Sequence, residues 1–270
     1  NIKYLDDLEG LCDLSVRALD EIIDYQEYPI VAAESSTKSR RSLGIGYIGL
    51  AHYLAKCKVK YNDKDAYKII DETTEAFQYY LLKASNNLAK EKGKCVLFHR
   101  TKYADGILPI DTYKKDVDDI VKRKLSYNWE SLRKDIIDHG LRHSTLSAQM
   151  PSESSSIVSN ATNGIEPPRD YLSVKKSKKG PLKQIVPGFP YLKNNYTLLW
   201  DKDTREGYIN IVSIMQKYFD QAISGNWSYN PEHYDNTYDS KSDGDEVKVE
   251  EQPIQITQEE DPENCEACTI

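Results

Sequence analysis

Long apolar runs are absent from the sequence, and this absence argues against a membrane-spanning protein. No segment approaches the roughly 18 consecutive apolar residues that a membrane-spanning helix needs, and the start is not the basic-then-apolar pattern of a secretory signal. An excess of basic residues is also absent, because 36 Lys and Arg stand against 43 Asp and Glu. A cytoplasmic protein with no membrane or nucleic-acid partner is therefore expected, since non-specific nucleic-acid binding needs a basic surface.

Cysteine is scarce, and its distribution argues against a disulfide framework. Cys12, Cys57 and Cys95 are scattered, whereas Cys265 and Cys268 form a close pair near the last residue. A mobile dithiol that carries reducing equivalents and two inert surface cysteines both fit this placement. No second Cys or His pair lies nearby, and the histidines lack ligand spacing, so no metal site is predicted.

Most of the chain shows the apolar periodicity of helices. Apolar residues recur at three- and four-residue spacing in six segments: residues 5–28, 43–56, 65–93, 111–121, 129–138 and 208–224. Pro29 and Gly93 supply two of the expected stops. Residues 34–42 are polar and basic, and a loop is expected there.

The last third of the chain has a different pattern. Residues 144–150 alternate as a strand does, and residues 171–174 and 182–186 are expected to pair as a β-hairpin around a basic, Gly-containing loop. Beyond that region, the sequence is acidic and poor in large apolar residues. This composition predicts a folded part over residues 1–228 and a disordered acidic tail over residues 229–270.

The segment from Gly44 to Gly49 matches the dinucleotide-binding fingerprint G-x-G-x-x-G by letters alone. That motif binds a pyrophosphate only when a buried strand precedes it, and residues 35–42 are too polar for such a strand. We therefore interpret the glycines as allowing close packing of a helix. A nucleotide-dependent dehydrogenase would rest on this segment only.

A second candidate site is the hydroxyl-rich segment PSESSS at residues 151–156. Clustered hydroxyls at the start of a helix, with free backbone N–H groups, can bind an anion such as phosphate. An ordinary Ser-rich helix cap is the alternative, and local chemistry leaves both open.

Three consecutive motifs give the chain a specific resemblance. Residues 141–150 (LRHSTLSAQM), 151–156 (PSESSS) and 159–169 (SNATNGIEPPR) resemble the large, catalytic subunit of class Ia ribonucleotide reductase, of the kind found in enterobacteria and T-even-type phages. Supporting matches lie at residues 40–46, 78–85 and 106–116. The resemblance runs from about residue 5 to about residue 234 and resumes at the terminal cysteines.

The resemblance implies a fold and a role for each candidate site. The fold would be the C-terminal part of the ten-stranded α/β barrel of this family, helix-rich and followed by the tail. The family reduces ribonucleoside diphosphates by radical chemistry. The positions matching Pro151, Ser152, Glu153, Ser154 and Ser155 bind the substrate diphosphate there.

The resemblance also gives the terminal cysteines a role. Cys265 and Cys268 match a dithiol that reduces the active-site disulfide after each turnover, and thioredoxin or glutaredoxin then re-reduces it. The radical cysteine, its neighbours, the active-site redox pair and the effector sites of the family lie before residue 1. The Tyr-Tyr relay segment of the family is missing near Tyr238.

We therefore expect one part of a split or truncated reductase, inactive alone. The start at Asn1 fits a cut, processed or excerpted chain. Its partners would be an N-terminal part of the large subunit and a small subunit that carries a diferric-tyrosyl radical, whereas this chain itself would hold no cofactor. If the chain is phage-encoded, it would work in the host cytoplasm. The alternative is a non-catalytic interaction fragment that offers its dithiol to thioredoxin-type partners.

Overall fold

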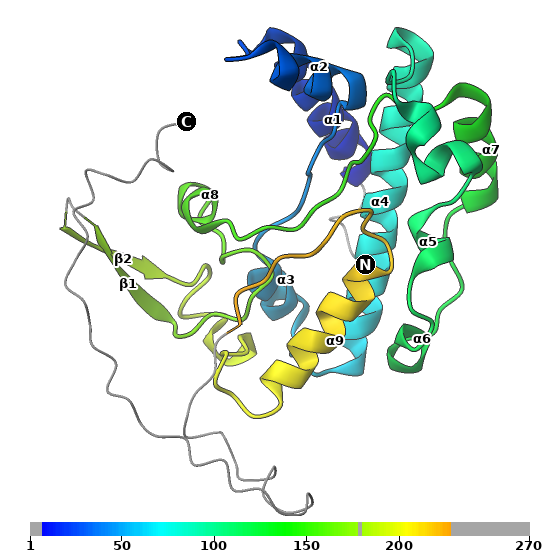
Figure 1. The fold of residues 1–270 in the computed structure, drawn as a ribbon. Helices are drawn as coiled ribbons and strands as arrows, with labels where there is room; N and C mark the ends of the chain where they lie inside the picture. The colour runs from blue at the N-terminus through cyan, green and yellow to red at the C-terminus, as the bar shows by residue number, and fades with distance from the viewer. Residues whose placement is uncertain (1–6, 178–179, 228–270) are drawn as a thin grey trace, which may run out of the picture. The chain divides into compact units, whose positions relative to one another are not determined.

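The computed structural model describes residues 7–177 and 180–227, which are mostly helical (Figure 1). The described helices are α1 Leu8–Tyr25, α2 Val31–Arg40, α3 Leu50–Cys57, α4 Lys64–Lys92, α5 Pro109–Thr112, α6 Val117–Ile120, α7 Trp129–His139, α8 Glu153–Val158 and α9 Thr204–Gln216. Short 3₁₀ turns cover Phe98–Arg100, Lys102–Asp105 and Lys193–Asn195. The two strands are β1 Leu172–Ser177 and β2 Gly180–Ile185. The helix-rich character is thereby confirmed.

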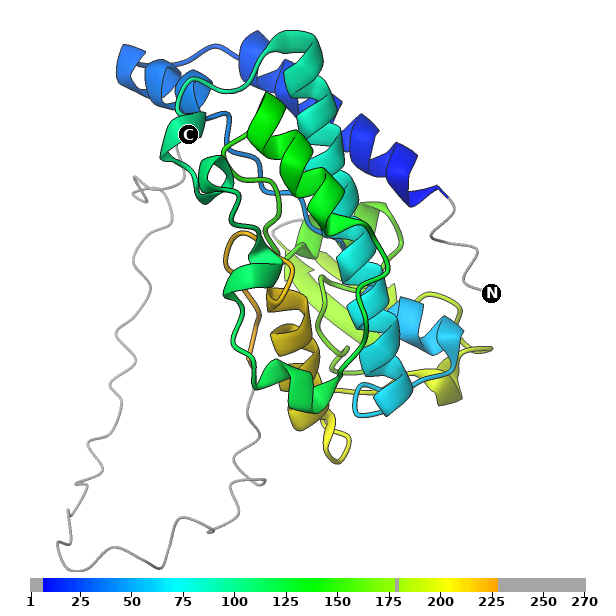
Figure 2. The same ribbon diagram turned by 90° about the vertical axis from the view of Figure 1, so that its right-hand side faces the viewer.

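Helix α4 is the central element of the described part, and it contacts α1, α7 and α9 (Figures 1 and 2). Its apolar face points inward, with Phe77, Leu81 and Leu88 buried. The helix ends before Gly93, whose φ of +85° suits a residue without a Cβ. The predicted helix over residues 65–93 is confirmed.

Helix α1 confirms the first predicted helix but buries only some of the apolar residues whose spacing predicted it. Val16 and Ile23 are buried, whereas Leu11 and Ile22 are 57% and 51% exposed. The position of a polar group explains part of this, because Asp20 occupies the inner face of α1 and is fully buried. A periodicity of apolar residues could not show that a carboxylate takes a core position.

Residues 34–42 are not the loop that their polarity predicted, because most of them belong to α2. The helix ends at Arg41, which has a left-handed φ of 49° and is buried. The Arg41 guanidinium donates to Asp20 Oδ1 at 2.6 Å and to both carboxylate oxygens of Asp24 at 2.8 Å. This long-range ion pair fixes the end of α2, and a local reading of residues 34–42 cannot include it.

The buried Asp20 carboxylate should make the stability of the fold sensitive to acid. Burial alone would raise the pKa of Asp20, but hydrogen bonds from His143 and Arg41 and the charge of Arg142 outweigh burial and lower it. A lowered folded-state pKa means that Asp20 stabilises the fold above its ordinary pKa of about 4, and that this stability is lost as the pH falls below that value.

We expect the free energy of unfolding, measured by urea titration, to fall between about pH 4 and pH 2, where Asp residues take up protons in the unfolded chain. Asp20→Asn should be less stable than wild type at pH 7 and should lose less stability over this range. An equally steep acid loss in that variant would show that other carboxylates, such as Asp24, dominate.

The predicted helix over residues 43–56 is correct only in its second half, α3. Residues before Gly49 are extended instead, and Ile45 forms a parallel bridge with Ser147. A Cβ at Gly46 would lie 2.4 Å from the carbonyl oxygen of Ala148, so a side chain cannot fit between the two segments. The glycines therefore permit close approach of two extended segments and not helix packing.

Residues 144–150 are extended, as predicted, and they lie between two parallel neighbours. Ser147 bridges Ile45 on one side, and Gln149 bridges Ile223 on the other. The bridges are isolated and do not form a continuous ladder. Extended segments paired in parallel are typical of α/β folds.

Two further predictions concern elements around this region. The β-hairpin is confirmed, with β1 and β2 antiparallel and Leu172 opposite Ile185. The predicted helix over residues 111–121 is wrong as one element, because the short α5 and α6 stand there. The last predicted helix ends at Gln216 in α9, eight residues earlier than expected.

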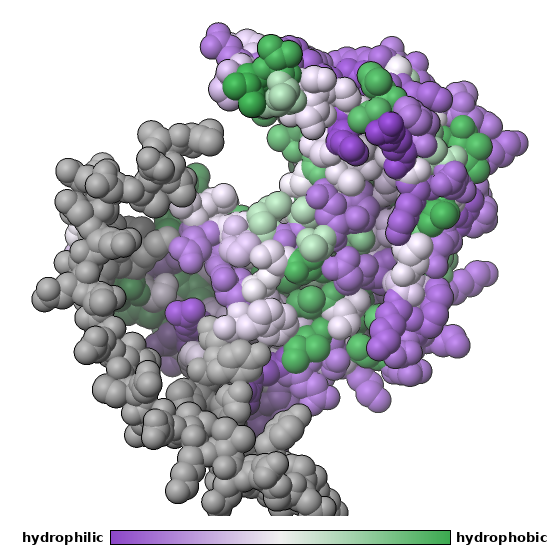
Figure 3. All heavy atoms as spheres, in the orientation of Figure 1, coloured by the Kyte–Doolittle hydropathy of each residue, from purple (hydrophilic) through white to green (hydrophobic). Residues whose placement is uncertain are grey.

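The face of the molecule seen in Figure 3 is largely hydrophilic with scattered hydrophobic groups. A hydrophobic patch lies over α2 in this view, and the exposed apolar residues at the start of that helix are Ile30 and Val31. Among the described residues, no helix is long and apolar enough to cross a bilayer.

Candidate functional site

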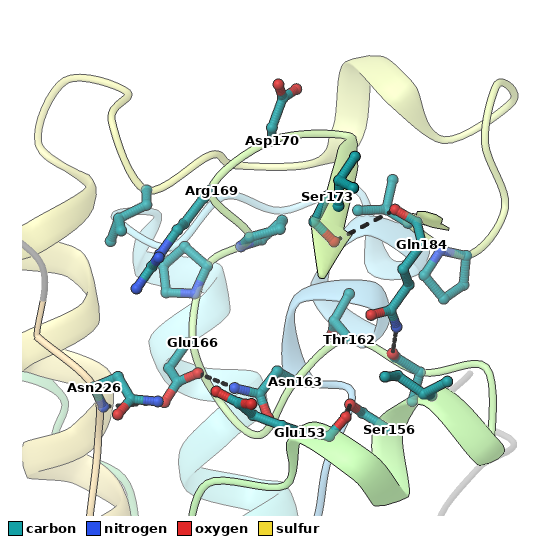
Figure 4. A pocket seen from close by; sticks show the side chains of 18 residues that line it. Glu153, Ser156, Thr162, Asn163, Glu166, Arg169, Asp170, Ser173, Gln184 and Asn226 are labelled. Atoms are coloured by element: carbon teal, nitrogen blue, oxygen red, sulfur yellow. Dashed lines mark hydrogen bonds between the residues drawn. The ribbon is translucent and has the colours of Figure 1, made fainter. Parts of the chain in front are cut away.

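A cavity of about 310 Å³ opens beside α8 (Figure 4). Its walls come from α8, from the segment of residues 161–170, from the hairpin and from Asn226. Figure 4 shows Arg169 extending toward the Glu166 side of the cavity, whereas Asp170 points away from it. The cavity adjoins the hydroxyl-rich segment that the sequence singled out.

The residues predicted to bind phosphate are the two that precede α8 and the first three of α8 itself, and we call residues 151–155 the anion loop. Of the five predicted residues, only Glu153 lines the cavity, while Pro151, Ser152, Ser154 and Ser155 lie outside its lining. The hydroxyls of Ser154 and Ser155 are exposed and make no hydrogen bond within the described part of the chain. They are therefore available to a ligand.

Helix α8, whose first three residues belong to the anion loop, provides less electrostatic stabilisation of an anion than the sequence suggested. Helix α8 has six residues and lacks a side-chain cap, which excludes the simple N-cap interpretation of the serines. So short a helix has a small dipole, so an anion would have to be held mainly by hydroxyl and N–H donors.

Sequence reasoning missed two residues that hold the anion loop in place, Asn163 and Glu166. The backbone N–H of Ser152 donates to Asn163 Oδ1 at 2.9 Å, and Asn163 Nδ2 donates to Glu166 Oε2 at 2.6 Å. Glu166 Oε1 in turn accepts from the backbone N–H of Asn226 at 3.0 Å. Both residues lie in the motif at 159–169, which carried the resemblance but was given no role.

The charges around the cavity are mainly negative. Among the described residues, Glu153, Glu166 and Asp170 line it together with one cation, Arg169. Burial raises the pKa of Glu166, donors from Asn226 and Asn163 oppose this effect, and the Glu153 charge adds to it. No group of three or more His, Cys, Asp or Glu in the described residues could hold a metal ion.

The Gly44–Gly49 segment does not have the geometry of a dinucleotide site. Gly44 and Gly46 lie within an extended segment, and only Gly49 adjoins a helix, α3. The N–H groups at the start of α3 are already bound, because Gly49 donates to Thr162 O and Leu50 donates to Gly164 O. A pyrophosphate would find these donors occupied.

The cysteines within the described residues are free thiols in unreactive settings. Cys12 and Cys95 are buried and Cys57 is half-buried. Burial raises the pKa of Cys12 to about 12, so its nucleophilic thiolate form is scarce at neutral pH. Cys265 and Cys268 lie outside the described residues, as does the tail predicted over residues 229–270.

Comparison with known proteins gives a consistent result. The family described as "Ribonucleotide reductase, barrel domain" matches residues 3–242. The chain is 59% identical over 234 residues to the ribonucleoside-diphosphate reductase subunit alpha of Haemophilus influenzae, covering 87% of this chain and 31% of that protein.

Two further relatives span bacteria and phage. The ribonucleoside-diphosphate reductase 1 subunit alpha of Escherichia coli is 57% identical over 212 residues, or 78% of this chain and 28% of that protein. The subunit alpha of Enterobacteria phage T4 is 44% identical over 229 residues, or 84% and 30%. The chain thus spans about a third of the length of these relatives. It belongs to the barrel-domain family of ribonucleotide reductases.

Proposed function

We propose that this chain supplies the diphosphate-binding loop and the reducing dithiol of a ribonucleoside-diphosphate reductase. One observation carries the proposal: within the family match, the anion loop presents beside a cavity the hydroxyls of Ser154 and Ser155, which have no partner among the described residues. Hydroxyl and N–H donors are the groups that hold a phosphate where cations are few. The substrate would be a ribonucleoside diphosphate.

The proposal requires other chains for the radical chemistry. An N-terminal part of the large subunit would bring the radical cysteine and the active-site disulfide pair. A small subunit would bring the diferric-tyrosyl radical, so this chain would hold no cofactor of its own. Cys265 and Cys268 would return two electrons to the active-site disulfide, and thioredoxin or glutaredoxin would then reduce them.

Reconstitution tests the proposal. This chain would be mixed with the N-terminal part of a close relative, the small subunit, thioredoxin and its reducing system, and CDP reduction would be measured. We expect dCDP to form only when all components are present. A stable complex that gives no product would refute the enzymatic role and favour a non-catalytic fragment that offers its dithiol to thioredoxin-type partners.

Removing the loop hydroxyls should weaken substrate binding. A hydrogen bond to a charged group is worth about 1.5–3 kcal/mol, so Ser154→Ala with Ser155→Ala should raise the KM for CDP by at least about 10-fold. Ser213→Ala is the matched control, because that hydroxyl donates to Ile209 O on α9, away from the cavity lining. An unchanged KM in the loop variant would remove the phosphate role from these serines.

A further inference from the structure

A chain of three hydrogen bonds, which we call the bridge, runs from the anion loop to Asn226. Figure 4 shows its bond between Asn163 and Glu166. Ser152 N–H binds Asn163, Asn163 binds Glu166, and Glu166 binds the N–H of Asn226. The bridge therefore connects the loop to a residue 74 positions later in the sequence. Within the described residues, no other hydrogen bond of Ser152 reaches beyond the loop and its immediate neighbours, because its hydroxyl donates to Met150 O and its carbonyl accepts from Ser156.

The bridge has a fixed direction of donors and acceptors. The Asn163 amide must present its oxygen to the Ser152 N–H and its NH₂ group to the Glu166 carboxylate. Neither Asp at 163 nor Gln at 166 can do this alone. Asn163→Asp would place two carboxylates in contact. Glu166→Gln would turn its NH₂ group either toward the Asn163 NH₂ group or toward the Asn226 N–H, which would then lack its acceptor.

We propose that Asn163 and Glu166 are positioning residues of the diphosphate site, which hold the anion loop in its binding conformation through this bridge. The inference rests on the proposed function, because it assigns these residues to the same loop. By holding the Ser152 N–H, Asn163 fixes the turn that leaves the Ser154 and Ser155 hydroxyls exposed. The ordering of the loop then precedes ligand binding and does not reduce affinity.

The geometry allows a reciprocal exchange as the test. Asn163→Asp combined with Glu166→Gln restores a complete bridge with one donor reversed: the new carboxylate accepts from Ser152 N–H and from the new amide, whose oxygen accepts from Asn226 N–H. We expect Asn163→Asp and Glu166→Gln each to weaken pyrophosphate binding about 10-fold, the value of one charge-assisted hydrogen bond, and the double variant to bind within about 3-fold of wild type. Titration calorimetry of the full chain with inorganic pyrophosphate measures this.

Ser213→Ala is the control, because its hydroxyl donates to Ile209 O on α9, away from both the cavity lining and the bridge. Amide hydrogen exchange over residues 151–156 gives a readout without ligand: it should be faster in both single variants and normal in the double variant. Single variants with wild-type affinity and exchange, or a double variant that is not restored, would overturn the inference. If exchange in the variants follows this pattern but the wild-type chain does not bind pyrophosphate, the diphosphate role of the loop is refuted instead.

Discussion

Replacing Cys265 and Cys268 by serine is expected to reduce steady-state CDP reduction by the reconstituted complex to background. Under the proposed function, each turnover would oxidise a pair of active-site thiols to a disulfide. Regeneration would transfer two electrons and two protons to that disulfide, while the tail dithiol would close to a disulfide of its own. A serine hydroxyl cannot carry out this exchange, so the complex should stop after one turnover. The measurement is dCDP formed per complex with thioredoxin as reductant.

A single-turnover assay shows whether the tail cysteines only supply electrons or also take part in the reduction of the substrate. A complex reduced beforehand and then freed of reductant should form about one dCDP per active site with serine-substituted tails and about two with wild-type tails, because the reduced wild-type dithiol can re-reduce the active-site disulfide once. Cys57→Ser is the matched control, since Cys57 is a half-buried free thiol on α3 and should be dispensable in both assays. Loss of the first turnover in the tail variant would contradict the shuttle role.

Substituting Glu75 by alanine is expected to cause the largest loss of stability in the described part. Glu75 is fully buried on α4, and its Oε1 accepts from Ser126 N at 2.8 Å, Tyr127 N at 3.2 Å and Trp129 Nε1 at 3.0 Å. Its other oxygen binds the Arg123 guanidinium. Glu75→Ala leaves three N–H donors without their acceptor and leaves Arg123 with Asp71 as its remaining carboxylate partner, so we expect a loss of about 3–5 kcal/mol in the free energy of unfolding.

Two further variants show that this loss comes from the buried acceptor. Glu75→Gln keeps an oxygen for the three N–H donors but removes the charge opposite Arg123, so its loss should be smaller. Glu72→Ala lies on the same helix with a partly exposed side chain and should change the free energy of unfolding by less than about 1 kcal/mol. Equal losses at positions 72 and 75 in urea titrations would mean that helix α4 is weakened generally.

Local patterns identified the elements whose stability comes from their own amphipathic face. Helices α1, α4 and α7 were predicted because apolar residues recur at helical spacing and a Gly or Pro follows each end. The hairpin was predicted from two short runs around a turn. Helix α2 was missed because it buries none of its own residues, and its end is held by Arg41 and the carboxylates of α1.

The glycines of residues 44–49 also show that local spacing cannot by itself choose between structural interpretations. Their spacing fits a dinucleotide site, a packed helix or a tight strand contact equally well. Only the carbonyl oxygen of Ala148, 102 residues after Gly46, makes a side chain impossible there. The choice between these interpretations depends on a contact that is far away in the sequence.

The sequence by itself determined the family, the hydroxyl-rich loop at 151–155 as a candidate anion site and the terminal cysteine pair as a candidate dithiol. Residue types and short spacings carry that information, because donors, acceptors and thiols have their chemistry wherever they lie. The tertiary structure alone decided that Asn163 and Glu166 hold the loop, and that Glu153 alone among the predicted residues lines the cavity. A hydrogen bond depends on distance and direction, and here the bridge reaches Asn226, which only folding brings to Glu166.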